Sequence, residues 1–173
     1  FPVRYAIEQG AEQLLRDIPT CMDPQALLLL ITERLDELLQ PESFVLYANA
    51  STSSVPLIVR GGAVPPILEA GRPLLSALRA RRTPLEVDRW RSAAKAYLDS
   101  EDLEALDRIR ATIVIPFTRG ERLVAFLCLG QKRSGDVYVS TDLALLAVVV
   151  DKTATEFMRF TEPEVEKRIA ALM

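Results

Sequence analysis

The sequence contains no histidine in its 173 residues, and this absence excludes several classes of function. Without histidine the chain cannot form a Ser-His-Asp or Cys-His catalytic arrangement, nor a histidine-ligated haem. It also lacks the side chain that nearly every zinc or non-haem iron site uses as a ligand. We therefore expect no bound transition metal and no active site of these kinds.

Cysteine is scarce, because the chain has only Cys21 and Cys128. These two residues lie too far apart in the sequence for a Cys-x-x-Cys redox or metal pair. Scarce cysteine is typical of a reducing compartment, so we expect a cytoplasmic protein. Cys128 falls within a predicted strand, where a thiol usually packs as a small hydrophobic group, and a redox sensor is the alternative.

Long apolar runs and an excess of basic charge are missing as well. The longest apolar run covers residues 143–150, whereas a membrane-spanning helix needs about 20 such residues. The net charge of −3 argues against a nucleic-acid partner. The chain begins with Phe1 and shows no signal peptide, so we expect it to be a segment of a longer protein.

The residues that are present predict a folded domain, because 49% are apolar and 26% are charged. Apolar residues recur at helical spacing over 3–18, 24–39 and 141–160, with Ser140 as the expected cap of the last helix. The first and last helices each have a seam with near-heptad spacing. The two seams are Val3, Ile7, Ala11, Leu14 and Ile18, and Leu146, Val150, Thr153, Phe157 and Phe160.

Four β-rich runs lie between these helices, at residues 44–47, 55–59, 112–117 and 122–129. The last two flank an Arg-Gly-Glu turn and are apolar on both faces, which predicts a hairpin in the middle of a sheet. Pro56 cannot donate a ladder hydrogen bond, so its strand should lie at an edge or contain a bulge. Short helices are expected after Pro73 and after Ser100, within a mixed segment over 61–110.

This order of elements predicts an α+β domain, with an antiparallel sheet, the terminal helices on one face and a helical or loop insert on the other. We expect residues 1–22 to be an N-terminal linker or signalling helix, 23–160 the domain, and 161–173 the start of a C-terminal linker helix. The seams predict a homodimer through helices 3–18, 24–39 and 141–160.

The stretch from 122 to 138 reads RLVAFLCLGQKRSGDVY, and STDLALL follows from residue 140. These residues resemble a GAF domain of a bacterial signalling protein, over roughly residues 24–160. The resemblance is to members that precede histidine kinase, PP2C-type phosphatase or nucleotide cyclase domains. It implies a GAF-like fold and a role in sensing small molecules.

Departures from the family's better-known members narrow the expected ligand. Phosphodiesterase-type members have Asn-Lys followed by Phe-x-x-x-Asp-Glu; here Lys132 and Asp142 are kept, whereas Gln131, Tyr138 and Leu143 replace the others. This half-match argues against a cyclic nucleotide. Bilin-binding and haem-binding members need histidine, and those that reduce methionine sulfoxide need several cysteines, so we expect no cofactor.

The resemblance implies that the middle segment closes over a ligand, which makes Tyr47, Trp90 and Tyr97 candidate pocket residues. The alternative is that these aromatic side chains are ordinary core. A basic stretch in the same segment is either an anion-binding lip or a solvated surface, and it comprises Arg79, Arg81, Arg82, Arg89 and Arg91. The acidic residues over 99–104 are expected to favour the start of a helix rather than bind a metal.

Lys132, Tyr138 and Asp142 form the candidate structural motif. The turn between them permits Lys132 and Asp142 to pair, with Tyr138 packed over them; in the alternative, Lys132 points into water. From all of this we expect a non-enzymatic sensory module that binds an unidentified small molecule and relays the signal through dimeric helices to an output domain outside this segment. The alternatives are a ligand-free dimerisation module and a thiol-based redox enzyme.

Overall fold

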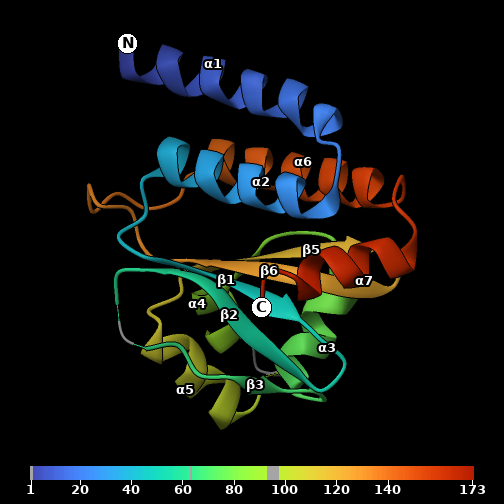
Figure 1. Cartoon of the computed structure of the whole chain (residues 1–173). Coiled ribbons are helices and arrows are strands. Elements are labelled where there is room, and N and C mark those ends of the chain that lie inside the picture. Colours follow the sequence, from blue (N-terminus) through green and yellow to red (C-terminus); the bar gives the residue numbers. More distant parts are fainter. Residues whose placement is uncertain (1, 63, 93–97) are drawn as a thin grey trace.

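The computed structural model describes residues 2–62, 64–92 and 98–173, which form three layers (Figure 1). Helices from the two chain ends cover one face of a sheet, and the middle segment of the chain covers the other. In chain order the elements are α1 (Pro2–Asp17), η1 (Ile18–Thr20), α2 (Pro24–Leu39), β1 (Phe44–Asn49), β2 (Ser53–Arg60), β3 (Leu68–Glu69), α3 (Pro73–Ala80), β4 (Leu85–Glu86), α4 (Val87–Ser92), α5 (Ser100–Arg108), β5 (Ile113–Arg119), β6 (Arg122–Leu129), α6 (Ser140–Phe157) and α7 (Glu162–Ala170).

The sheet has six antiparallel strands in the order β3-β2-β1-β6-β5-β4. This confirms the α+β fold class, and the β5–β6 hairpin lies in the middle of the sheet as its apolar pattern predicts. Strands β3 and β4 were not expected from the sequence. Each has only two residues, too few to produce a recognisable alternation of apolar and polar positions.

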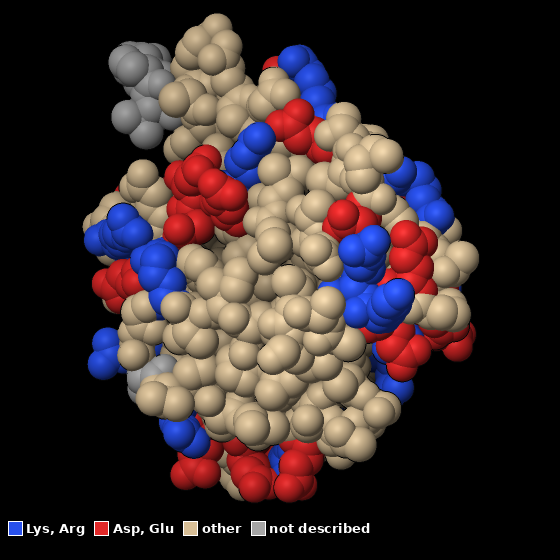
Figure 2. All heavy atoms as spheres, viewed as in Figure 1, with Lys and Arg blue, Asp and Glu red and all other residues tan. Residues whose placement is uncertain are grey.

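Strand β2 has an open outer edge over most of its length, because β3 pairs with it only at Ser53 and Ser54. Opposite Pro56 the register between β1 and β2 shifts, with Leu46 facing Ile58 and Tyr47 facing Pro56. The structure therefore confirms both features expected of Pro56, an edge position and a bulge. In Figure 2, which has the same view as Figure 1, the centre of the visible surface lies over the β1–β2 hairpin and has few charged side chains.

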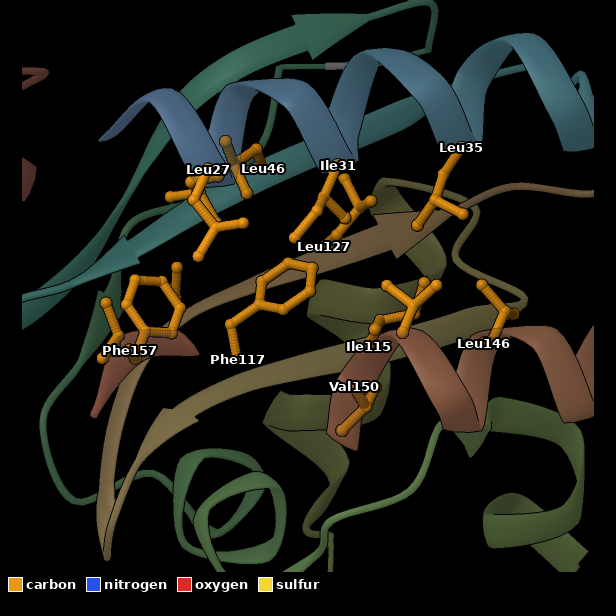
Figure 3. Packing of buried hydrophobic residues seen from close by; sticks show 14 of the residues in the cluster. Leu27, Ile31, Leu35, Leu46, Ile115, Phe117, Leu127, Leu146, Val150 and Phe157 are labelled. Carbon is orange, nitrogen blue, oxygen red and sulfur yellow. The ribbon is translucent and has the colours of Figure 1, made fainter. Parts of the chain in front are cut away.

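Two hydrophobic cores lie on opposite faces of the central strands. On the helical side, Phe117 and Leu127 point from the sheet toward Ile31 of α2, as Figure 3 shows. On the insert side, Phe126 and Cys128, which alternate with Leu127 along β6, pack against the middle segment. Burial of one such apolar side chain contributes about 1.5–3 kcal/mol, so both faces of β6 contribute to the stability of the domain.

Helix α6 differs from expectation at both ends. Val139 occupies the cap position in place of Ser140, and the Asp142 carboxylate accepts a hydrogen bond from the Val139 amide at 2.9 Å. The helix ends at Phe157 rather than near residue 160. Its predicted seam is buried against the sheet, from Leu146 to Phe160, so that seam does not provide a surface for a second copy.

Helix α7 turns back onto the domain. Its Val165 and Ile169 are buried in the core on the helical side, and α7 packs against α2 and β6. The expectation that residues 161–173 begin a linker stays a prediction. In the structure the helix within this segment packs on the domain, against α2 and β6. Within the described residues, no helix combines the length and the apolar composition that crossing a membrane requires.

A buried carboxylate joins two helices of the insert, α3 and α5. Asp102 of α5 is fully buried and accepts hydrogen bonds from the Leu74 amide of α3 at 2.9 Å and from Arg72 Nε at 3.0 Å. Arg72 also pairs with the more exposed Asp99 and Glu101. The acidic stretch thus joins α5 to the start of α3, in addition to capping its own helix through Asp99.

We expect Asp102→Ala to lower the free energy of unfolding by about 2–3 kcal/mol, because it removes a charged acceptor and leaves the Leu74 amide buried without a partner. Glu101→Ala is the matched control. Its carboxylate contacts the same arginine from an exposed position, so its loss should cost about 0–1 kcal/mol. Urea unfolding of both variants measures the difference. Equal losses of unfolding free energy would contradict the role of Asp102 in joining α5 to α3.

Candidate functional site

Two hollows lie on the flanks of α3 and share Gly71 and Ser76. The larger has a volume of about 630 Å³ and opens to solvent between α3 and α4. Its floor consists mostly of small side chains, with one aromatic ring and one guanidinium at the rim. The lining residues are Gly71, Pro73, Ser76, Ala77, Ala80, Arg81 and Trp90. We call this the Trp90 hollow.

Arg81 and Trp90 form the polar and aromatic part of the Trp90 hollow. The Arg81 guanidinium carbon lies 5.0 Å from the centroid of the Trp90 ring, at cation–π distance. Arg81 Nη2 donates to the Thr83 hydroxyl at 3.2 Å. Arg81 Nε is buried and has no hydrogen-bond partner among the described residues. A buried donor without a partner is costly, so this arginine is held in place at a cost in stability.

Tyr47 lies away from this hollow. It is fully buried in β1 and stacks on Phe126, with ring centroids 4.8 Å apart and planes at 12°. Its hydroxyl donates to the Pro66 carbonyl oxygen at 2.8 Å, and burial raises its pKa. The structure therefore places Tyr47 in the core on the insert side and Trp90 at a surface hollow. Tyr97, the third candidate, lies outside the described residues.

The five arginines of the basic stretch divide among different roles. Arg81 lines the Trp90 hollow and Arg79 lines the second one, whereas Arg82 is exposed. Arg91 pairs with Asp107 and Arg89 pairs with Glu86. The stretch is therefore partly a solvated, ion-paired surface and partly a border of the two hollows.

Lys132, Tyr138 and Asp142 come together at the start of α6. Lys132 Nζ lies 2.7 Å from Asp142 Oδ2 and 5.5 Å from the Tyr138 ring centroid. The two charged side chains are only 19% and 13% exposed. The Tyr138 hydroxyl donates to the Gly130 carbonyl oxygen at 2.6 Å, and burial together with the Asp142 charge raises its pKa. Of the two alternatives for Lys132, the ion pair is the one found.

The two cysteines occupy opposite faces of the sheet. Cys128 is buried in the core on the insert side, and Cys21 packs at the edge of the core on the helical side. Burial raises the pKa of both thiols, so neither is a ready thiolate at neutral pH. Within the part of the chain that the structure describes, no group of three or more Cys, Asp or Glu side chains could hold a metal ion.

Residues 23–157 match the model of the GAF domain family. The GAF domain of a phosphoenolpyruvate-protein phosphotransferase from Coxiella burnetii is 17% identical, with a TM-score of 0.58 over 88% of this chain and 93% of that one. A free methionine-R-sulfoxide reductase from Neisseria meningitidis, solved with its substrate, is 15% identical, with a TM-score of 0.59 over 94% and 90%. A search of curated proteins found no match. At these identities the solved structures establish the fold alone.

We expect the Lys132–Asp142 pair to show a coupling energy of about 1–2 kcal/mol in a double-mutant cycle of Lys132→Ala and Asp142→Ala, because both charges are mostly shielded from water. Asp142→Ala should cost more than Lys132→Ala, since it also removes the acceptor for the Val139 amide. Asp142→Asn is the control that keeps an acceptor without the charge. Purely additive losses in urea unfolding would contradict the coupling.

Proposed function

The chain belongs to the GAF domain family, a regulatory fold that binds small molecules, and on this premise we propose that it is a non-enzymatic sensory module. In this proposal a small molecule binds beside α3 and biases the packing of the terminal helices. Those helices relay the state to an output domain in a longer bacterial protein. A cytoplasmic location, inferred from the scarce cysteine, is part of the same proposal.

The observation that supports a ligand is the Arg81 guanidinium that lies beside the Trp90 ring in the lining of the hollow. A ligand with a flat, apolar part could lie on the small side chains of the hollow and contact the exposed part of Trp90. A carbonyl, ring nitrogen or carboxylate on that ligand would accept from the Arg81 guanidinium, which lines the hollow. The hollow thus favours a planar molecule with at least one hydrogen-bond acceptor.

Native mass spectrometry of gently purified protein tests this proposal. We expect a co-purifying small molecule with the unaltered chain, and its loss in Arg81→Gln and in Trp90→Ala. Arg82→Gln is the matched control, because it removes the same charge one residue away and lines neither hollow. Retention of the molecule by Arg81→Gln, or no bound molecule in any sample, would contradict binding in the Trp90 hollow.

The cysteines support a non-enzymatic role. A thiol reductase needs a reactive thiolate and a partner thiol or ligand site beside it. Cys128 is buried with a raised pKa, and Cys21 lies on the other face of the sheet. The absence of histidine removes the usual activating base.

A homodimer through α1, α2 and α6 is the proposed route of the relay. Each of these helices leaves a large apolar side chain exposed, with Tyr5 and Ile7 on α1, Leu29 on α2 and Val148 on α6. The first half of α1 also extends away from the other helices in Figure 1. The α6 seam that the sequence predicted as the interface is buried, so the proposed interface consists of these exposed residues instead.

We expect a dimer in light scattering at tens of micromolar protein, and a shift toward monomer in Val148→Glu, because a dimer would bury the new charge. Val64→Glu is the control. Val64 is 78% exposed, and its carbonyl oxygen accepts a hydrogen bond from Arg108 of α5 on the insert side, so its replacement should leave the dimer intact. A monomeric unaltered chain, or equal effects of the two variants, would contradict this interface.

A ligand-free dimerisation module is the second candidate, and the packing around Tyr47 favours it. The space between sheet and insert is filled there by the stacked rings of Tyr47 and Phe126, and the tyrosine hydroxyl is already satisfied by Pro66. The two candidates differ in the mass spectrometry above. A dimer without any bound molecule would favour the second.

A further inference from the structure

The second hollow beside α3 lies at the end of the sheet, where four parts of the fold meet. It has a volume of about 310 Å³ and is lined by the turn between β1 and β2, the start of β6, one flank of α3 and one residue of α7. The polar side chains on its walls are Asn49, Ser51, Ser76, Arg79, Arg122 and Glu166. We call it the Arg79–Arg122 hollow.

Of the two arginines in this hollow, Arg79 has fewer hydrogen-bond and ion-pair partners than Arg122. It is exposed in the last turn of α3, and among the described residues it makes no hydrogen bond or ion pair. A guanidinium presents several donors in one plane, which suits a carboxylate or a phosphate bound through two oxygens. One wall of the hollow therefore offers a free set of donors.

Arg122, which also lines this hollow, forms long ion pairs with two carboxylates of α7. Its Nη1 lies 3.4 Å from the Glu162 carboxylate and 3.9 Å from that of Glu166. Both carboxylates are more than half exposed, so these ion pairs contribute little to stability. Figure 2 shows acidic and basic side chains interleaved where α7 lies in Figure 1. An anion in the hollow could replace these carboxylates as the partner of Arg122.

Helix α7 depends on its contacts with the domain. It has nine residues, too few for a stable isolated helix, and its buried side chains are Val165 and Ile169. The turn before it is fixed by Arg119 Nε, which donates to the Phe160 carbonyl oxygen at 3.0 Å. The loss of Arg122 as a partner would remove the ion pairs of Glu162 and Glu166 and, because these pairs are exposed, would increase the local opening of α7 modestly.

From this geometry we infer that the Arg79–Arg122 hollow binds a small oxyanion, a carboxylate or phosphate compound, and that this anion competes with α7 for Arg122. Binding and docking of α7 then oppose each other, and by linkage the effect is reciprocal. The site lies on the other flank of α3 from Arg81 and Trp90, so it goes beyond the function proposed above and connects ligand binding to the C-terminal helix.

Titration with sodium phosphate and with sodium succinate, followed by amide chemical shifts at constant ionic strength, tests the site. We expect Arg79→Gln and Arg122→Gln each to weaken phosphate or succinate binding at least tenfold, and Arg82→Gln to leave it unchanged. Tighter binding of phosphate would indicate a phosphate compound, and tighter binding of succinate a dicarboxylate. Binding of neither probe, or equal weakening in Arg82→Gln, would overturn the site.

The competition with α7 has its own readout. The double variant Glu162→Gln, Glu166→Gln should bind the better probe about two- to fivefold more tightly, which is the range that such exposed ion pairs allow. That probe should also accelerate amide hydrogen exchange over residues 164–172 in the unaltered chain, but not in Arg79→Gln. Unchanged exchange at saturation would overturn the competition. Trp90→Ala should leave both results intact, so failure of the Trp90 hollow and failure of this site are distinguishable.

Discussion

The antiparallel pairing of β1 with β6 is the constraint on which the other layers depend. Both strands have hydrogen-bonded neighbours on each side, and their side chains alternate between two hydrophobic cores. Leu127 faces the terminal helices, and Phe126 and Cys128 face the insert. Because adjacent residues contact different layers, a shift of one position would move apolar side chains to the wrong core. The pairing thus fixes where α6 and α3 lie relative to each other.

Much of this arrangement could be predicted from periodicity, because long helices and the β5–β6 hairpin have regular apolar patterns. The features that could not be predicted depend on contacts between distant residues. The cap at Val139 arises from a hydrogen bond with Asp142, and a local sequence rule favours Ser140 instead. The reversal that returns α7 to the core depends on its contacts with α2 and β6, which no pattern within residues 158–170 reveals.

The candidate site was predicted in part. The sequence pointed to the middle segment and to Trp90, which does border a hollow, and the composition of the segment indicated arginines nearby. It could not decide which of Trp90 and Tyr47 borders a hollow, because that depends on how the insert packs on the sheet, and only the sheet register and burial place Tyr47 in the interior. Nor could it show that Arg79 and Arg81, two residues apart, line hollows on different flanks of α3.

The incomplete pairing of β2 has a consequence for the molecule at high concentration. An apolar strand with an open edge can recruit the same strand of another molecule, which begins edge-to-edge aggregation. Pro56 lacks the amide hydrogen that such pairing would use, and the bulge opposite it interrupts the regular spacing of the remaining donors and acceptors. One residue that weakens the sheet locally therefore acts as a gatekeeper, and it lets the domain keep a mostly uncharged face without a covering strand.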